Sequence, residues 1–79
     1  MNGREIAKAA GSVLRENRLT AGYSQRYIAR LCGRDSSQIS RFERTGVGSP
    51  DMLLAYFLAM PERVEYIVED FLEVLKYER

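Results

Sequence analysis

The side chains best suited to chemistry in this chain lie between Ser36 and Arg44. If residues 36–45 form a helix with Ile39 and Phe42 pointing inward, its first turn and outer face carry hydroxyl, amide and guanidinium groups. The residues concerned are Ser36, Ser37, Gln38, Ser40 and Arg41. Such groups can form hydrogen bonds with base-pair edges in the major groove of DNA. The segment is therefore a candidate for reading double-stranded DNA.

Arginine is concentrated around this segment. Five arginines fall within nineteen residues, opposed only by Asp35 and Glu43; they are Arg26, Arg30, Arg34, Arg41 and Arg44. The formal net charge is only +1, but residues 1–48 contain nine basic and four acidic side chains, whereas residues 62–79 contain three and six. This asymmetry is typical of a protein that meets phosphate on one face. A plain solvated helix face is the alternative, and motif and charge together favour nucleic-acid binding.

Few of the residue types that catalysis requires are present. The chain has no histidine and one cysteine, Cys32, which excludes histidine-based triads, imidazole metal sites and an internal disulfide. We expect Cys32 to be a packed core residue rather than a nucleophile. We expect no enzyme activity, metal, cofactor or small-molecule ligand. A single thiol fits the cytoplasm, and no apolar run approaches the roughly 18–20 residues of a membrane span.

Two short helices joined by a tight turn are predicted for residues 24–45. Ser24 can cap the first helix, whose inward face is predicted from the i, i+3, i+4 spacing of Tyr27, Ile28, Leu31 and Cys32. Gly33 can end that helix with a positive φ. Asp35 and Gln38 have the spacing of a capping box for the second helix. The pattern is that of a helix-turn-helix.

Three further helices complete an all-α single domain of residues 1–79. The first covers residues 2–19, and Gly11 within it marks a bend or a close helix contact. Ser49-Pro50 starts a helix through Met60 that is apolar nearly all round, which predicts burial on more than one side. Directly before this helix, residues 45–48 form either a plain loop or a stretch whose backbone comes close to a phosphate.

The last predicted helix, about 62–77, has more apolar surface than a small core requires. Its apolar positions are Val64, Ile67, Val68, Phe71, Leu72 and Leu75. We expect this face to contact a second copy of the chain, and a homodimer would also stabilise so short a protein. The alternative is that the helix only closes the core of the monomer.

The chain resembles the lambda-repressor-like family of helix-turn-helix domains, also called the Cro/CI or Xre type. The match covers about residues 11–60, at Gly11, Leu14-Arg15, Arg18, Gly22-Tyr-Ser-Gln25, Ile28-Ala29, Gly33, Ser37, Ile39-Ser40, Phe42-Glu43, Pro50, Met52, Leu58 and Ala59. Small members are phage repressors, restriction-modification controller proteins and antitoxins, which are dimeric binders of palindromic operators. The resemblance implies a compact five-helix domain in the bacterial cytoplasm or nucleoid.

The resemblance also implies roles for single residues. Gln25 would bind a phosphate and brace the recognition helix. Base contacts would come from Ser36, Ser37 and Arg41, with Gln38 at a base or the backbone and Arg44 at a phosphate or base edge. Arg18 and Glu43 would form an ion pair between the first and third helices.

Three positions depart from the family pattern. Arg34, Cys32 and Asn17 replace residues that are usually apolar. We expect Arg34 to swing out to a phosphate.

The sequence therefore predicts a homodimeric, sequence-specific DNA-binding transcription regulator, most simply a repressor or autoregulator. Its two recognition helices would enter successive major grooves of a palindromic operator, about 34 Å apart. The alternative is a protein-interaction module, such as an antitoxin or anti-repressor, that acts through its acidic C-terminal helix. RNA binding is a weaker alternative, because no aromatic stacking platform is evident.

Overall fold

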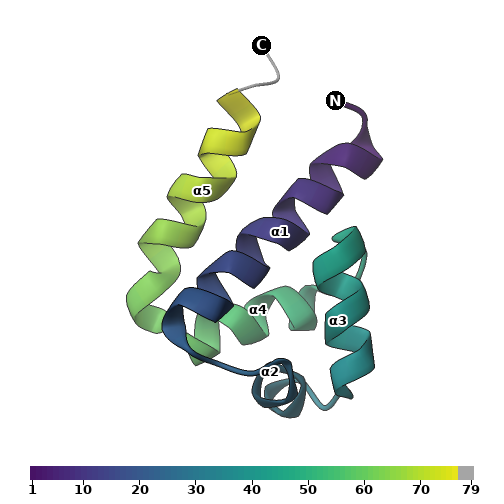
Figure 1. The fold of residues 1–79 in the computed structure, drawn as a ribbon, viewed down its shortest axis with the longest axis vertical. Coiled ribbons are helices and arrows are strands. Elements are labelled where there is room, and N and C mark those ends of the chain that lie inside the picture. The colour runs from purple at the N-terminus through teal and green to yellow at the C-terminus, as the bar shows by residue number, and fades with distance from the viewer. Residues whose placement is uncertain (77–79) are drawn as a thin grey trace.

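A computed structural model describes residues 1–76 of the chain, and this part is all-helical. Its elements are α1 (Gly3–Ala21), α2 (Gln25–Leu31), α3 (Ser36–Thr45), α4 (Pro50–Ala59), a single 3₁₀ turn η1 (Pro61–Arg63) and α5 (Val64–Lys76). Helices α1 and α5 lie side by side and run in opposite directions, α3 packs against α1, and α2 packs against both α3 and α4 (Figure 1). The predicted all-α class with five helices is confirmed for the described residues.

The boundaries of α2 and α3 follow from the caps that the sequence predicted. Ser24 Oγ accepts a hydrogen bond of 3.0 Å from the Tyr27 N–H. Asp35 Oδ1 accepts one of 3.0 Å from the Gln38 N–H, and Gln38 Oε1 accepts one of 3.0 Å from the Asp35 N–H. Gly33 lies between the two helices with φ +66°. The start of α3 is therefore fixed by a complete capping box.

Two glycines allow α1 and the C-terminal end of α3 to approach each other closely. A Cβ atom on Gly11 would lie 2.5 Å from the carbonyl oxygen of Glu43. A Cβ atom on Gly46 would lie 1.6 Å from the carbonyl oxygen of Ala7, and Gly46 also has φ +71°. Gly11 thus marks a close helix contact rather than a bend. The absence of a side chain at Gly46 allows the backbone of α1 to come close to this residue.

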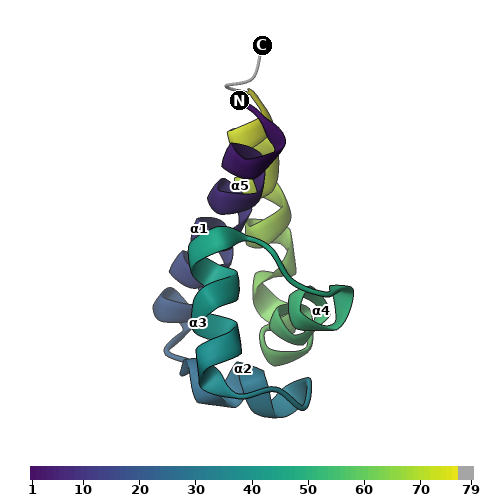
Figure 2. The ribbon, with the colours of Figure 1, turned by 90° about the vertical axis from the view of Figure 1, so that its right-hand side faces the viewer.

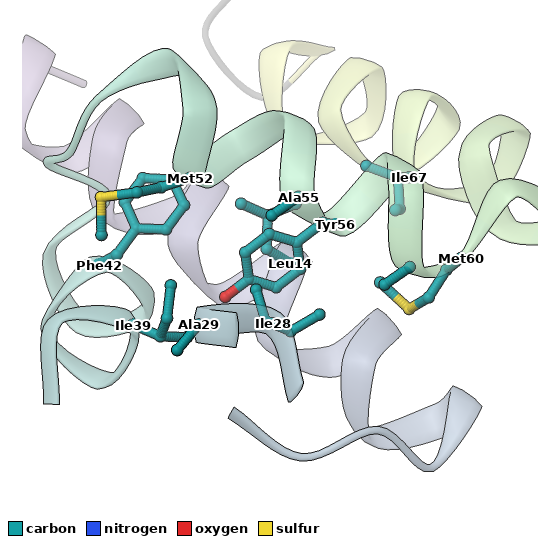
Figure 3. Packing of buried hydrophobic residues seen from close by; sticks show 11 residues of the cluster. Leu14, Ile28, Ala29, Ile39, Phe42, Met52, Ala55, Tyr56, Met60 and Ile67 are labelled. Atoms are coloured by element: carbon teal, nitrogen blue, oxygen red, sulfur yellow. The ribbon is translucent and has the colours of Figure 1, made fainter. Parts of the chain in front are cut away.

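The core draws on all five helices. Its buried apolar residues are Leu14, Ile28, Ala29, Ile39, Phe42, Met52, Ala55, Tyr56, Ala59, Met60 and Ile67. Figure 3 shows the ring of Tyr56, from α4, beside Leu14 and Ile28. The Phe42 and Tyr56 rings are tilted against each other with centroids 6.1 Å apart. Tyr56 therefore connects α4 to α1, α2 and α3, and no atom of its ring reaches solvent.

Two predictions of burial are wrong. In α2 the buried residues are Ile28 and Ala29, whereas Tyr27 and Leu31 are exposed. In α4 the outer face is uncovered, and Leu58 is 70% exposed. The physical reason is that α4 packs against α2 and the start of the α5 segment on one side only, as its position at the edge of the molecule in Figure 2 indicates.

The last helix begins at Val64, two residues later than predicted. Pro61 has no N–H to continue the backbone hydrogen-bond ladder of α4, so the chain turns through η1 before α5 begins at Val64. The predicted end at Tyr77 lies outside the described residues. Within residues 1–76, every helix is too short or too polar to cross a membrane.

Candidate nucleic-acid interface

Helix α3 presents one apolar and one polar face, as the sequence predicted. Ile39 and Phe42 are buried in the core. The side chains of Ser36, Ser37, Gln38, Arg41 and Arg44 are exposed, and Ser40 is half-buried. Helix α3 lies along the right-hand edge of the molecule in Figure 1 and faces the viewer in Figure 2, with α2 beneath its N-terminus. The outer face of α3 is thus accessible over its full length.

The exposed side chains of α3 differ in how far they are committed to other bonds. The Ser37 hydroxyl donates to the Asp35 carboxylate, and Gln38 Oε1 accepts in the capping box. The hydrogen bond from Ser37, with that from the Gln38 N–H, lowers the pKa of Asp35. Within residues 1–76, the side chains of Ser36 and Arg41 make no hydrogen bond or ion pair. Ser36 and Arg41 are therefore the groups most available to a ligand.

A buried carboxylate anchors the other end of α3. Glu43 is 3% exposed. Its Oε2 accepts from Arg18 Nε at 2.7 Å and from the Tyr56 hydroxyl at 2.7 Å. Its Oε1 accepts from Arg18 Nη2 and Gln25 Nε2, both at 2.9 Å. The ion pair implied by the resemblance is confirmed, and it is part of a larger network that ties α3 to α1, α2 and α4.

The network keeps Glu43 ionised. Burial alone would raise the pKa of this carboxyl, but the hydrogen bonds from Arg18, Gln25 and Tyr56 outweigh burial and lower it. The hydrogen bond to Glu43 and the negative charge of the Glu43 carboxylate raise the pKa of Arg18, although Arg18 is buried. Burial, with the bond to Glu43, also raises the pKa of Tyr56. The three groups are thus locked in one protonation state, which holds α3 in one orientation.

Sequence reasoning missed Tyr56 as a member of this network. It lies in a helix that is apolar nearly all round, so periodicity does not show which way the phenol points. The only available signal is that a buried tyrosine hydroxyl needs a hydrogen-bond partner.

Arg34 does not extend outward as the sequence led us to expect. Its Nη2 donates to Ser49 Oγ at 2.9 Å, and its guanidinium lies 3.2 Å from Asp51 Oδ2. The physical reason is that the first turn of α4 offers a hydroxyl and a carboxylate within reach of this long side chain. The hydrogen bond from Ser49 and the Arg34 guanidinium lower the pKa of Asp51. Arg34 therefore fastens the α2–α3 turn to α4.

The remaining arginines flank α3 on both ends. Arg26 and Arg30 are exposed on α2, and together with Ser36 they line a polar hollow of about 440 Å³ at the junction of α2 and α3. Arg44 is exposed near the end of α3, where its Nη1 lies 3.4 Å from Ser40 Oγ. Gln25 is half-buried, and one of its two amide N–H donors is used by Glu43.

The predicted interface on α5 needs correction. Ile67 is fully buried, so it is not free to contact a second copy, and Phe71 and Val64 are half-buried. The reason is that α5 lies on α1 and uses this face to close the monomer. Val68, Leu72 and Leu75 stay exposed and form an apolar stripe at i, i+4 and i+7.

Leu75 of this stripe also lines a groove of about 480 Å³. The groove lies between α1, the residues that lead into α4, and α5, and its walls are mainly apolar. Ile6, Ala10, Leu53, Phe71 and Leu75 are among the residues that line it.

Comparisons with known proteins identify no relative of this chain. No protein-family model, curated protein or solved structure matches it.

Proposed function

We propose that this protein is a sequence-specific regulator of transcription that binds double-stranded DNA as a homodimer. In this proposal α2 and α3 are the helix-turn-helix of a lambda-repressor-like domain, with α3 as the recognition helix. The observation that carries it is the outer face of α3. There Ser36 and Arg41, which have no partner within residues 1–76, lie on a helix whose far end is fixed by the Glu43 network. Rigid placement of hydrogen-bonding groups is what base readout requires.

The roles proposed for reading bases follow from how much of each α3 side chain's hydrogen-bonding capacity is free for DNA. Arg41 is exposed and without an internal partner among the described residues, and its guanidinium can donate two hydrogen bonds to guanine O6 and N7. Ser36 can donate or accept. Ser37 and Gln38 have less hydrogen-bonding capacity left for bases, because the Ser37 hydroxyl bonds to Asp35 and Gln38 Oε1 takes part in the capping box. Specificity therefore rests mainly on Arg41, assisted by the shape of the DNA.

The phosphate contacts come from the flanking cations. Arg26 and Arg30 lie beside the N-terminus of α3, and Arg44 lies near its C-terminus. The second amide N–H of Gln25 is available to a phosphate oxygen while the first holds Glu43. Arg34 positions the α2–α3 turn instead of binding a phosphate, because its guanidinium is bonded to Ser49 and Asp51.

The dimer is proposed to form through the exposed stripe of α5. Val68, Leu72 and Leu75 lie on one side of that helix, and a two-fold axis would bring the same stripe of each copy together. To bind such an operator, the pairing must present the two α3 helices on one side of the dimer, about one turn of DNA apart. A dimer covering two half-sites would act as a repressor by excluding polymerase from a promoter.

Selection from a random double-stranded DNA library tests this proposal. Purified protein at near-physiological salt is expected to enrich a palindrome with half-site centres about 10 bp apart. Lys76→Ala serves as a control, because it removes one exposed cation at the C-terminal end of α5, outside α2 and α3, and should leave the motif unchanged. Salt-sensitive binding with no enriched motif would reduce the interaction to phosphate attraction. That result would favour the alternative, in which the acidic α5 binds another protein.

A further inference from the structure

A buried amide connects α1 to η1 and to the middle of α5. Asn17 is 1% exposed in the C-terminal half of α1. Its Nδ2 donates to Val13 O and to Asp70 Oδ2, each at 2.9 Å. Its Oδ1 accepts from Arg63 Nε at 3.0 Å. The side chain thus bridges a guanidinium in η1 and a carboxylate in α5.

The polarity of the amide gives this bridge a single arrangement. Its oxygen faces the cation and its nitrogen faces the anion, so turning the amide over would oppose like groups at both ends. An apolar side chain of similar size would fill the same space without selecting one position of α5. Buried polar groups are best known for fixing register and orientation in this way.

The bridge also acts at the joint from which α5 extends. Arg63 lies in η1, directly before α5, and its guanidinium is stacked over the Tyr66 ring at 4.9 Å from the centroid. Asp70 lies seven residues further along, so the bridge holds the chain just before α5 and again in the middle of α5. Ile67 packs in the core between these two points, and the polar contacts on either side of it fix the direction of α5.

We infer that Asn17, Arg63 and Asp70 form a polar latch that sets the angle of α5 and thereby the spacing of the two half-sites that the dimer accepts. This inference rests on the proposed function. The interface stripe is carried on α5, so the angle of α5 sets the separation of the two α3 helices. A helix of thirteen residues is about 20 Å long. A tilt of roughly 10° then moves its far end by about 3.4 Å, which is one base-pair step.

The test compares two changes at Asp70, which is exposed, so neither is expected to unfold the protein. Asp70→Asn keeps an oxygen acceptor for Asn17, whereas Asp70→Leu removes it. Binding is measured to duplexes that carry the selected half-sites at the natural spacing and at one base pair more or less, and to a single half-site. Sedimentation shows whether each variant is a dimer.

The wild type and Asp70→Asn are expected to prefer the natural spacing by roughly tenfold, because the duplex must otherwise be twisted or bent. In Asp70→Leu, and in Asn17→Leu, this preference is expected to fall to within about threefold, with single half-site affinity unchanged. The latch is refuted if Asp70→Leu keeps the wild-type preference, or if Asp70→Asn loses it equally. Loss of the dimer in both Asp70 variants would instead make Asp70 an interface residue. If the wild type selects no paired half-sites, the proposed function fails and the latch has no spacing to set.

Discussion

Replacing Glu43 with glutamine should destabilise the protein more than any single change on its surface. The amide side chain would keep the shape of the carboxylate but leave the Arg18 guanidinium, only 7% exposed, without a counter-charge. It would also set its own N–H group against donors from Arg18, Gln25 or Tyr56. Removing one partner from a buried ion pair costs about 3–5 kcal/mol.

The size of this loss can be compared with the stability available. Domains have roughly 0.05–0.15 kcal/mol of unfolding free energy per residue, and this chain has 79 residues. The total is then about 4–12 kcal/mol, so a loss of about 3–5 kcal/mol should remove a quarter or more of it. Urea unfolding followed by circular dichroism measures the difference. A double variant, Arg18→Met with Glu43→Leu, should recover much of the loss, because neither buried charge remains.

Acid gives an independent check on the same carboxylate. The pKa of Glu43 is lower in the folded protein than its ordinary value of 4.5. Its contribution to stability is therefore complete above pH 4.5 and is lost as the pH falls through the folded pKa. Wild-type stability should decline below pH 4.5, and Glu43→Gln should decline less steeply. A cost under 1 kcal/mol at neutral pH, with an unchanged acid profile, would refute the assigned role of Glu43.

Three further predictions concern the α1–α3 contact, the α2–α3 turn and α5. Gly46→Ala should lower the free energy of unfolding by about 2–4 kcal/mol, since a Cβ there meets the α1 backbone. Gly33 has a similar φ but open space around it, so Gly33→Ala should lower that free energy by only about 1–2 kcal/mol. Equal melting temperatures for the two variants would contradict this. Arg34→Leu should leave the salt dependence of DNA binding unchanged, whereas Arg26→Ala should reduce its slope by about 1; a matching reduction for Arg34 would restore it as a phosphate ligand. Leu72→Asp should yield a folded monomer by sedimentation and circular dichroism, because Leu72 is 53% exposed, and an unchanged dimer would place the interface elsewhere.

Local signals in the sequence were enough to predict where α2 and α3 begin. Ser24 and Asp35 cap their helices with side-chain hydrogen bonds, which depend only on residues three positions away. The Arg18–Glu43 pair spans 25 residues and was accessible only through the family resemblance, because local spacing carries no information at that distance.

Other features depended on tertiary neighbours and could not be read locally. Periodicity shows that a helix has an apolar face but not which part of that face is covered. The sequence therefore predicts a partner contact for Ile67, which is in the core, and burial on more than one side for α4, whose outer face is exposed. Arg34 could reach either solvent or the start of α4, and the position of Asp51 decided the outcome. Asn17 looked like a departure from an apolar position, and its partners became visible only in the fold.

The most direct test of DNA recognition is a base-pair scan of the selected operator with the wild type and Arg41→Lys. Lysine keeps the positive charge but cannot form the forked contact of arginine. The variant should lose about 1–3 kcal/mol on the operator, stop discriminating at one symmetric pair of positions, and bind random duplex as the wild type does. Identical scans for both proteins would contradict base readout by α3.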